Sequence, residues 1–164
     1  MTKKIMATLA VLGAVASAQW AAAQTVALPD LGFKLGDDVA TVKAALRTTA
    51  ETEPMARNAA LPPNFPDPNK GKAILHLRTR GIWAFFGANG NVETIRLDAP
   101  FAGNVLGIKL GDDARKITSK LGNPVKKPFP AFLVMQGYQY AIDDSAYATF
   151  DVNDDGVQFI LITR

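Results

Sequence analysis

Aromatic and arginine side chains in two predicted strand regions are the residues of this sequence best suited to bind another protein. The set consists of Trp83, Phe85, Tyr138, Tyr140, Arg78 and Arg80. Alternate residues of a strand point to one face of a sheet, so each aromatic pair shares a face. Trp, Tyr and Arg carry much of the binding energy in protein interfaces. The spacing predicts a partner-binding surface, but aromatic side chains packed in a core would show the same period.

A second group of residues matches the opening of a calcium-binding loop. Asp151, Asn153 and Asp155 alternate and are followed by Gly156. Ca²⁺ prefers such oxygen ligands, with a glycine at the sharp turn. The bidentate acid that the loop needs at its twelfth position is Ile162 here. We therefore expect a polar turn between two strands, with the three oxygen-bearing residues as an alternative calcium site.

The single histidine, His76, is the candidate for acid–base catalysis. A catalytic imidazole needs a nucleophile or an acid aligned beside it. The sequence contains no GxSxG motif, and its serines are Ser17, Ser119 and Ser145. We assign no catalytic residue. A small hydrolase that uses His76 and aspartate carboxylates remains the alternative to a binding protein.

An internal repeat defines the elements that must position these residues. Residues 31–38 and 106–113 share seven of eight residues at an offset of 75, and both end in Leu-Gly-Asp-Asp. Identity at this level is the signature of a duplicated structural unit.

A helix is predicted after each copy of the repeat. Apolar residues at i, i+3 and i+7 fall on one helix face. They are Val39, Val42 and Leu46 in the first copy and Ala114, Ile117 and Leu121 in the second. The aspartate pairs 37–38 and 112–113 stand where an N-cap carboxylate belongs, so we interpret them as caps rather than as catalytic acids.

Three strand patterns follow each helix. They cover residues 73–79, 82–86 and 92–97 in the first half, and 133–142, 147–152 and 157–162 in the second. The Asn-Gly at 89–90 is typical of a hairpin turn. We predict an α+β fold of two αβββ repeats with pseudo-twofold symmetry, whose helices pack on an antiparallel sheet.

The first 23 residues have the pattern of a secretory signal peptide. Lys3 and Lys4 precede an apolar stretch, 5–18, which is too short to cross a hydrocarbon core of about 30 Å. Small residues allow cleavage after Ala18 or Ala23. The predicted organisation is a signal peptide (1–23), a first repeat (24–105) with a Pro-rich insertion (54–69), and a second repeat (106–164). We expect a periplasmic or secreted protein with no membrane span after cleavage.

The composition excludes several classes of protein. The chain is 48% hydrophobic and 20% charged, which is typical of a globular domain. It has no cysteine, so disulfide scaffolds and thiolate sites are excluded. Loss of Lys3 and Lys4 with the leader lowers the net charge from +3 to +1. No cluster of Lys and Arg suits a phosphate backbone, so nucleic acid is not an expected partner, and no cofactor is predicted.

The repeat resembles that of the beta-lactamase inhibitory protein fold, and also the single unit of the SmpA/OmlA outer-membrane assembly lipoproteins. The matching residues are Gly32, Leu35, Gly36, Val39, Val42 and Leu46, then Gly107, Leu110, Gly111, Ile117, Leu121, Gly122 and Pro124. The chain lacks the lipid-anchor cysteine of the lipoproteins and the disulfides of the inhibitor. Both resemblances imply a non-catalytic module that binds another protein over its sheet.

The expected function is therefore a secreted or periplasmic binding module that docks on another envelope or secreted protein through its sheet and loops. An enzyme inhibitor and an envelope assembly factor are two forms of this function. The hydrolase with His76 and a calcium-stabilised structural protein are the alternatives.

Overall fold

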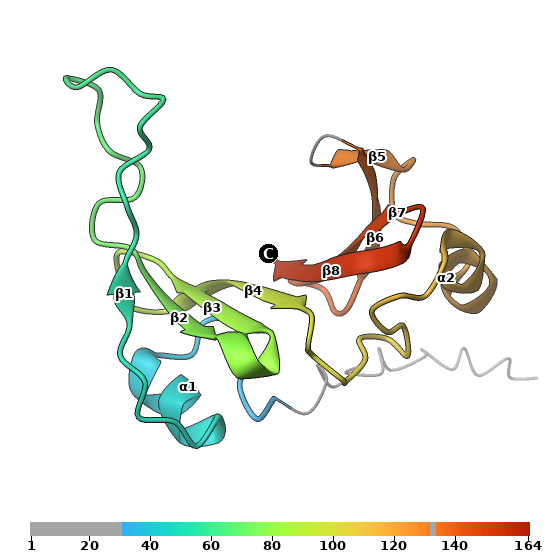
Figure 1. Ribbon diagram of the computed structural model, residues 1–164, viewed down its shortest axis with the longest axis horizontal. Helices are drawn as coiled ribbons and strands as arrows, with labels where there is room; N and C mark the ends of the chain where they lie inside the picture. The colour runs from blue at the N-terminus through green and yellow to red at the C-terminus, as the bar shows by residue number, and fades with distance from the viewer. Residues whose placement is uncertain (1–30, 132–133) are drawn as a thin grey trace, which may run out of the picture.

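The computed structural model describes residues 31–131 and 134–164, which form an eight-stranded antiparallel sheet with two short helices (Figure 1). The strands are β1 (Glu53–Pro54), β2 (Ala73–Leu77), β3 (Ile82–Phe86), β4 (Val92–Asp98), β5 (Phe129–Ala131), β6 (Met135–Ala141), β7 (Tyr147–Asn153) and β8 (Gly156–Thr163). The helices are α1 (Val39–Ala45) and α2 (Ala114–Leu121), and a 3-10 turn, η1 (Arg78–Arg80), joins β2 to β3.

The predicted signal peptide, residues 1–23, lies outside the described residues. Within 31–131 and 134–164, no helix has the length and apolar character needed to span a bilayer.

The order of the strands places the two halves of the chain side by side. It runs β1-β2-β3-β4-β8-β7-β6-β5, so each half is an antiparallel meander and the two meet where β4 pairs with β8. There Ile95 lies opposite Ile162, and Leu97 lies opposite Ile160. All four side chains are fully buried. The junction therefore continues the core from one half into the other, and each half has a short outer strand, β1 or β5, beyond the three that were predicted.

The prediction of an α+β fold with helices packed on the sheet is wrong, because the fold is predominantly β. The helices contain only seven and eight residues, and each buries a single side chain within its length, Val42 or Ile117. A helix of about two turns presents one short apolar stripe, so it adds one deep contact. The strands supply most of the remaining core.

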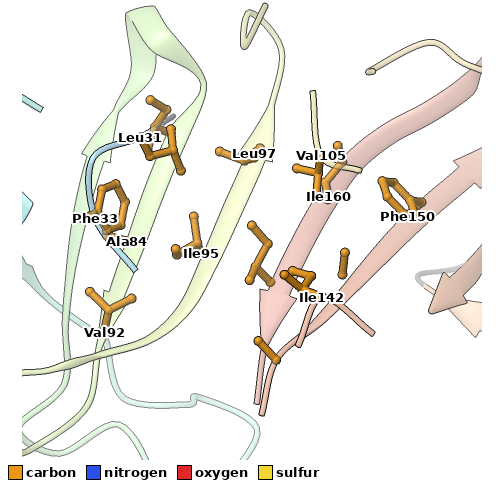
Figure 2. Packing of buried hydrophobic residues seen from close by; sticks show 14 of the residues in the cluster. Leu31, Phe33, Ala84, Val92, Ile95, Leu97, Val105, Ile142, Phe150 and Ile160 are labelled. Atoms are coloured by element: carbon orange, nitrogen blue, oxygen red, sulfur yellow. The ribbon is translucent and has the colours of Figure 1, made fainter. Parts of the chain in front are cut away.

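The core lies on one face of the sheet. Alternate residues of neighbouring strands, including Ala84, Ile95, Ile160 and Phe150, are completely buried there. Figure 2 shows these side chains next to Leu31, Phe33 and Val105, which come from segments outside the strands. Because side chains alternate along a strand, the intervening residues form a second face of the sheet. We call it the second face, and it is the face on which a binding site is sought.

The two copies of the repeat make the same hydrogen bonds. The backbone N–H of Gly36 donates to the carbonyl of Val92 at 2.9 Å, and that of Gly111 donates to the carbonyl of Val157 at 2.9 Å. Both glycines have positive φ, +92° and +80°, which residues with a Cβ rarely adopt. The shared Leu-Gly-Asp-Asp sequence thus ties the start of each helix to the start of a strand, β4 or β8.

Both helices begin at the aspartates that the sequence identifies as caps. Asp38 accepts from the N–H of Thr41, and Asp113 accepts from the N–H of Lys116, each at 2.7 Å. The bond from Thr41 holds the pKa of Asp38 below its ordinary value. These carboxylates are therefore occupied by helix capping, as the sequence predicts.

The long connection between β1 and β2, residues 55–72, contains most of the predicted Pro-rich insertion. It is held together by its own hydrogen bonds, since Arg57 donates to the carbonyls of Pro62 and Phe65, and Asn69 donates to that of Ala56. In Figure 1 this loop and β5 stand at opposite ends of the sheet, with the C-terminal end of β8 between them.

Candidate functional site

The second face of the sheet carries the candidate site, because it displays aromatic and charged side chains apart from the core. Across the strands, His76 lies opposite Trp83, Trp83 opposite Arg96, and Arg96 opposite Leu161. Directly opposed residues share a face, so this row runs over β2, β3, β4 and β8. We call the group formed by His76, Trp83, Phe85, Arg96, Asp98 and Phe159 the aromatic–arginine cluster.

The rings of the cluster are stacked. The centroids of His76 and Trp83 are 3.2 Å apart with an interplanar angle of 15°, and those of Trp83 and Phe85 are 6.1 Å apart at 5°. His76, Trp83 and Phe85 are each half-buried. Stacked, partly exposed rings present apolar area that loses little conformational freedom on binding, which favours interface formation.

Arg96 lies at the centre of the cluster. Its Cζ is 5.5 Å from the ring centroid of Trp83 and 4.4 Å from that of Phe159, which is the geometry of cation–π interactions. Its Nε donates to Oδ2 of Asp98 at 3.1 Å, and Nε1 of Trp83 donates to the same oxygen at 3.0 Å. The side chain of Arg96 remains 33% exposed. The guanidinium is therefore held in position and still reaches the surface.

A shallow hollow adjoins the cluster. It has a volume of about 260 Å³, and its lining includes Met55, Phe85, Thr94, Arg96 and Leu161. The Lys72–Glu93 ion pair, 3.2 Å between Nζ and Oε2, also lines it. The hollow thus combines an apolar floor with two cationic side chains, of which Lys72 already has an acidic partner.

The structure separates the aromatic residues that the sequence analysis grouped together. Trp83 and Phe85 lie on the second face. Tyr140 is buried with the core, where its hydroxyl donates to the carbonyl of Gly122 at 3.0 Å, and Tyr138 packs against the same core. Of the two readings left open for the tyrosine pair, packing in the core is the one observed, so the pair is not part of the second face.

The two predicted arginines lie outside the strands that carry the cluster, although the charge of Arg78 reaches His76. Arg78 and Arg80 belong to η1 rather than to a strand, and both are exposed. Nη1 of Arg80 donates to the carbonyl of Leu46 at 2.7 Å, just beyond the end of α1. Arg80 therefore links the β2–β3 connection to the helix.

His76 has no catalytic partner in the described part of the chain. It stacks on Trp83, and its buried Nδ1 has no hydrogen-bond partner among the described residues. Burial lowers its pKa, and the charge of Arg78 lowers it further. A ring stacked on an indole fits an apolar surface, and among the described residues no acid is hydrogen-bonded to it as a hydrolase would require.

The residues proposed for a calcium loop do not share a site. Asp151 is buried within β7, while Asp155 is exposed in the turn and its N–H donates to Oδ1 of Asn153 at 2.9 Å. Within residues 31–131 and 134–164, no group of three or more His, Cys, Asp or Glu side chains is placed to hold a metal. The side-chain oxygen of Asn153 therefore accepts a hydrogen bond from the backbone of the turn itself.

Asp151 is instead a buried carboxyl group on the second face. It is 1% exposed, and neither carboxyl oxygen has a hydrogen-bond partner among the described residues. It lies opposite Phe159 and Gly137, and a Cβ added at Gly137 would be 2.6 Å from Cζ of Phe129. Burial raises the pKa of Asp151 to about 6, with a smaller opposing effect from Arg96.

The predicted site does not include Asp98 or Phe159, and it does not include Arg96, although Arg96 lies in the same hairpin as Trp83. Each alternates correctly along its strand, but their proximity to Trp83 depends on which strands pair and in what register. The one available signal is that β3 and β4 flank the Asn-Gly turn, so a hairpin register already places Arg96 opposite Trp83.

No protein-family model and no curated protein matches this chain. Among solved structures, that of a DUF4309 family protein (YjgB) from Bacillus subtilis is similar to it, with a TM-score of 0.45 and 13% sequence identity over 77% of this chain and 78% of that chain. A similarity at this level carries no argument about function. The resemblance to the beta-lactamase inhibitory protein fold and to the SmpA/OmlA lipoproteins stays a prediction.

Proposed function

We propose that this chain is a secreted or periplasmic binding module that docks on another protein through the second face of its sheet. The aromatic–arginine cluster is the observation that supports this proposal. Half-buried Trp83 and Phe85 stack outside the core, and Arg96 is oriented between aromatic rings with a third of its side chain exposed. Trp and Arg held in place in this way are typical of interface hot spots.

The position of the cluster also supports docking. It lies on the inner strands β2, β3, β4 and β8 rather than on the edge strands β1 and β5. Interface energy concentrates near the centre of a contact, where surrounding residues exclude water. A partner centred on Trp83 would contact neighbouring strands on both sides of β3, namely β2 and β4.

The experiment is capture from an extract of the envelope and culture medium of the source cells, followed by affinity measurement. The full chain, Trp83→Ala and Val125→Ala are each immobilised. Val125 is a matched apolar control, because it is 55% exposed and lies before β5, outside the cluster. The retained protein is then purified, and its affinity for each variant is measured by calorimetry.

We expect Trp83→Ala to weaken binding by at least about tenfold, since truncation of a hot-spot residue costs about 2 kcal/mol or more. Val125→Ala should bind like the unmodified chain. The proposal is wrong if the unmodified chain retains no protein, or if Trp83→Ala binds the retained protein as tightly as the unmodified chain does.

A further inference from the structure

Resting on the function proposed above, we infer that the partner presents a carboxylate beside a bulky apolar side chain. Arg96 binds the carboxylate, and the hollow lined by Phe85 and Leu161 takes the apolar group. The inference joins two features of the second face that adjoin each other, a guanidinium with unused donors and an apolar depression.

The hydrogen bonding of Arg96 leaves donors for a ligand. A guanidinium carries five N–H groups in a planar fork that matches a carboxylate. Only Nε of Arg96 is used, in its bond to Asp98, and neither Nη atom bonds any other described residue. Within residues 31–131 and 134–164, the terminal nitrogens therefore have no acceptor and are the donors offered to a partner.

The setting of Arg96 reduces the entropy that such binding costs. The Asp98 carboxylate and the rings of Trp83 and Phe159 all contact the guanidinium. A long side chain that is already ordered loses less rotamer freedom when it binds. A preorganised arginine favours a planar anion, and Asp and Glu are the side chains that supply one in a protein partner.

The balance of charge in the hollow favours an anion over a cation. Lys72 and Arg96 line it together with a single acid, Glu93, which is paired with Lys72. Two further acids near Arg96 are Asp98, which accepts two hydrogen bonds, and Asp151, which is 1% exposed. The exposed acid Glu53 lies on the same face, near His76, but it does not line the hollow. Within the lining, the charge without an ion-pair partner on the lining itself is therefore that of Arg96.

The experiment uses small probes that carry the proposed chemistry. Phenylacetate, its neutral analogue phenylacetamide and the cation phenethylamine are titrated into the full chain labelled with ¹⁵N. Binding is followed by NMR at the indole Nε1–H of Trp83, which is bonded to Asp98. The variants are Arg96→Gln, Arg96→Lys and, as a matched control, Arg115→Gln, an exposed arginine in α2.

We expect phenylacetate to bind up to about fivefold more tightly than phenylacetamide, because a partly exposed ion pair contributes at most about 1 kcal/mol. Arg96→Gln should remove that difference, Arg96→Lys should retain part of it, and Arg115→Gln should leave it unchanged. Added sodium chloride should lower the affinity for phenylacetate and leave the affinity for phenylacetamide unchanged, because salt screens an exposed ion pair.

Equal binding of the acid and the amide by the unmodified chain would overturn the inference without any variant, so misfolding of Arg96→Gln cannot obscure the result. Preference for phenethylamine, or no binding of any probe, would overturn it too. These outcomes are separate from a failure of the docking function, which is decided by the effect of Trp83→Ala on the captured protein.

Discussion

The indole Nε1–H of Trp83 donates to Oδ2 of Asp98 across 3.0 Å, although the two residues are not opposite each other in the sheet. The same oxygen accepts from Nε of Arg96. One carboxylate oxygen thus orients both the largest ring and the central cation of the second face, so the cluster behaves as a single unit.

Loss of the indole donor should destabilise the protein while leaving an aromatic ring in place. In Trp83→Phe, the bond to Asp98 disappears and the apolar surface largely remains. A net hydrogen bond to a charged group is worth about 1.5 kcal/mol or more, so we expect a loss of that size in the free energy of unfolding, measured with urea. Trp83→Ala should lose more free energy of unfolding than Trp83→Phe, because it also removes the ring. If Trp83→Phe were as stable as the unmodified chain, the bond to Asp98 would contribute nothing to stability.

The buried carboxyl of Asp151 should make stability fall as the pH rises. Its folded pKa is about 6, whereas an unfolded aspartate has a pKa of about 3.9. Between these values the unfolded chain gives up its proton and the folded chain keeps it. The contribution of Asp151 to stability is therefore greatest below pH ~4, and it should decline by up to about 3 kcal/mol until the pH passes ~6.

Asp151→Asn tests this, because the amide does not ionise. Urea unfolding of the variant from pH 4 to pH 7 should show a smaller decline than the unmodified chain. Asp154→Asn, at an exposed position in the adjacent turn, is the control and should keep the original slope. Parallel pH profiles for Asp151→Asn and the unmodified chain would show that this carboxyl does not carry the effect.

The N-cap of α2 should contribute measurably to stability. Asp113→Ala removes the acceptor for the N–H of Lys116, and loss of such a cap costs about 1 kcal/mol. Asp113→Asn keeps an acceptor and should cost little. Thermal and urea unfolding of the two variants decide the point, since equal losses would mean that charge matters here and capping does not.

Two turn glycines should differ in their tolerance of alanine. Gly156 has a φ of +94°, and an added Cβ would lie 2.4 Å from the carbonyl oxygen of Gly111. Gly90 has a φ of +79° with open space around it. Gly90→Ala should cost about 1 kcal/mol from backbone strain alone. Gly156→Ala should cost clearly more, because the backbone of Gly111 must also move.

Unfolding midpoints of the two glycine variants test this comparison. A larger loss at Gly156 would show that the contact between the β7–β8 turn and the second Leu-Gly-Asp-Asp segment is tightly packed. If Gly90→Ala were the more damaging change, the close approach of Gly156 to Gly111 would be of no energetic importance.

The local elements of this protein were predictable because their signals are local. Asp38 and Asp113 cap the helices, and the turn at Gly90 joins β3 to β4, as their sequences indicate. Each depends on hydrogen bonds or backbone angles within a few residues. The fold class was predicted wrongly for a related reason. Periodic apolar residues indicate that a helix forms, but they do not indicate what share of the core it contributes, and here each helix buries a single side chain within its length.

The candidate site was half predictable. The alternation of Trp83 with Phe85 correctly placed the two side chains on one face, and the alternation of Tyr138 with Tyr140 did the same for the tyrosines. The period does not distinguish a face that packs in the core from one that does not. Burial of Tyr140 and packing of the half-buried Tyr138 against the core follow from the pairing of β6 with β7, which places them opposite Ala148 and Phe150 on the core face.

By itself, then, the amino-acid sequence determined the repeat, the helix starts, the turns and the two-residue period of each strand, because these depend on neighbours in the chain. Tertiary structure decided which face became the core, and it brought Arg96 to Trp83 and buried Asp151 beside Phe129. Those outcomes depend on pairing between distant strands, above all β4 with β8, and the apolar burial that selects this pairing is a property of the whole sheet.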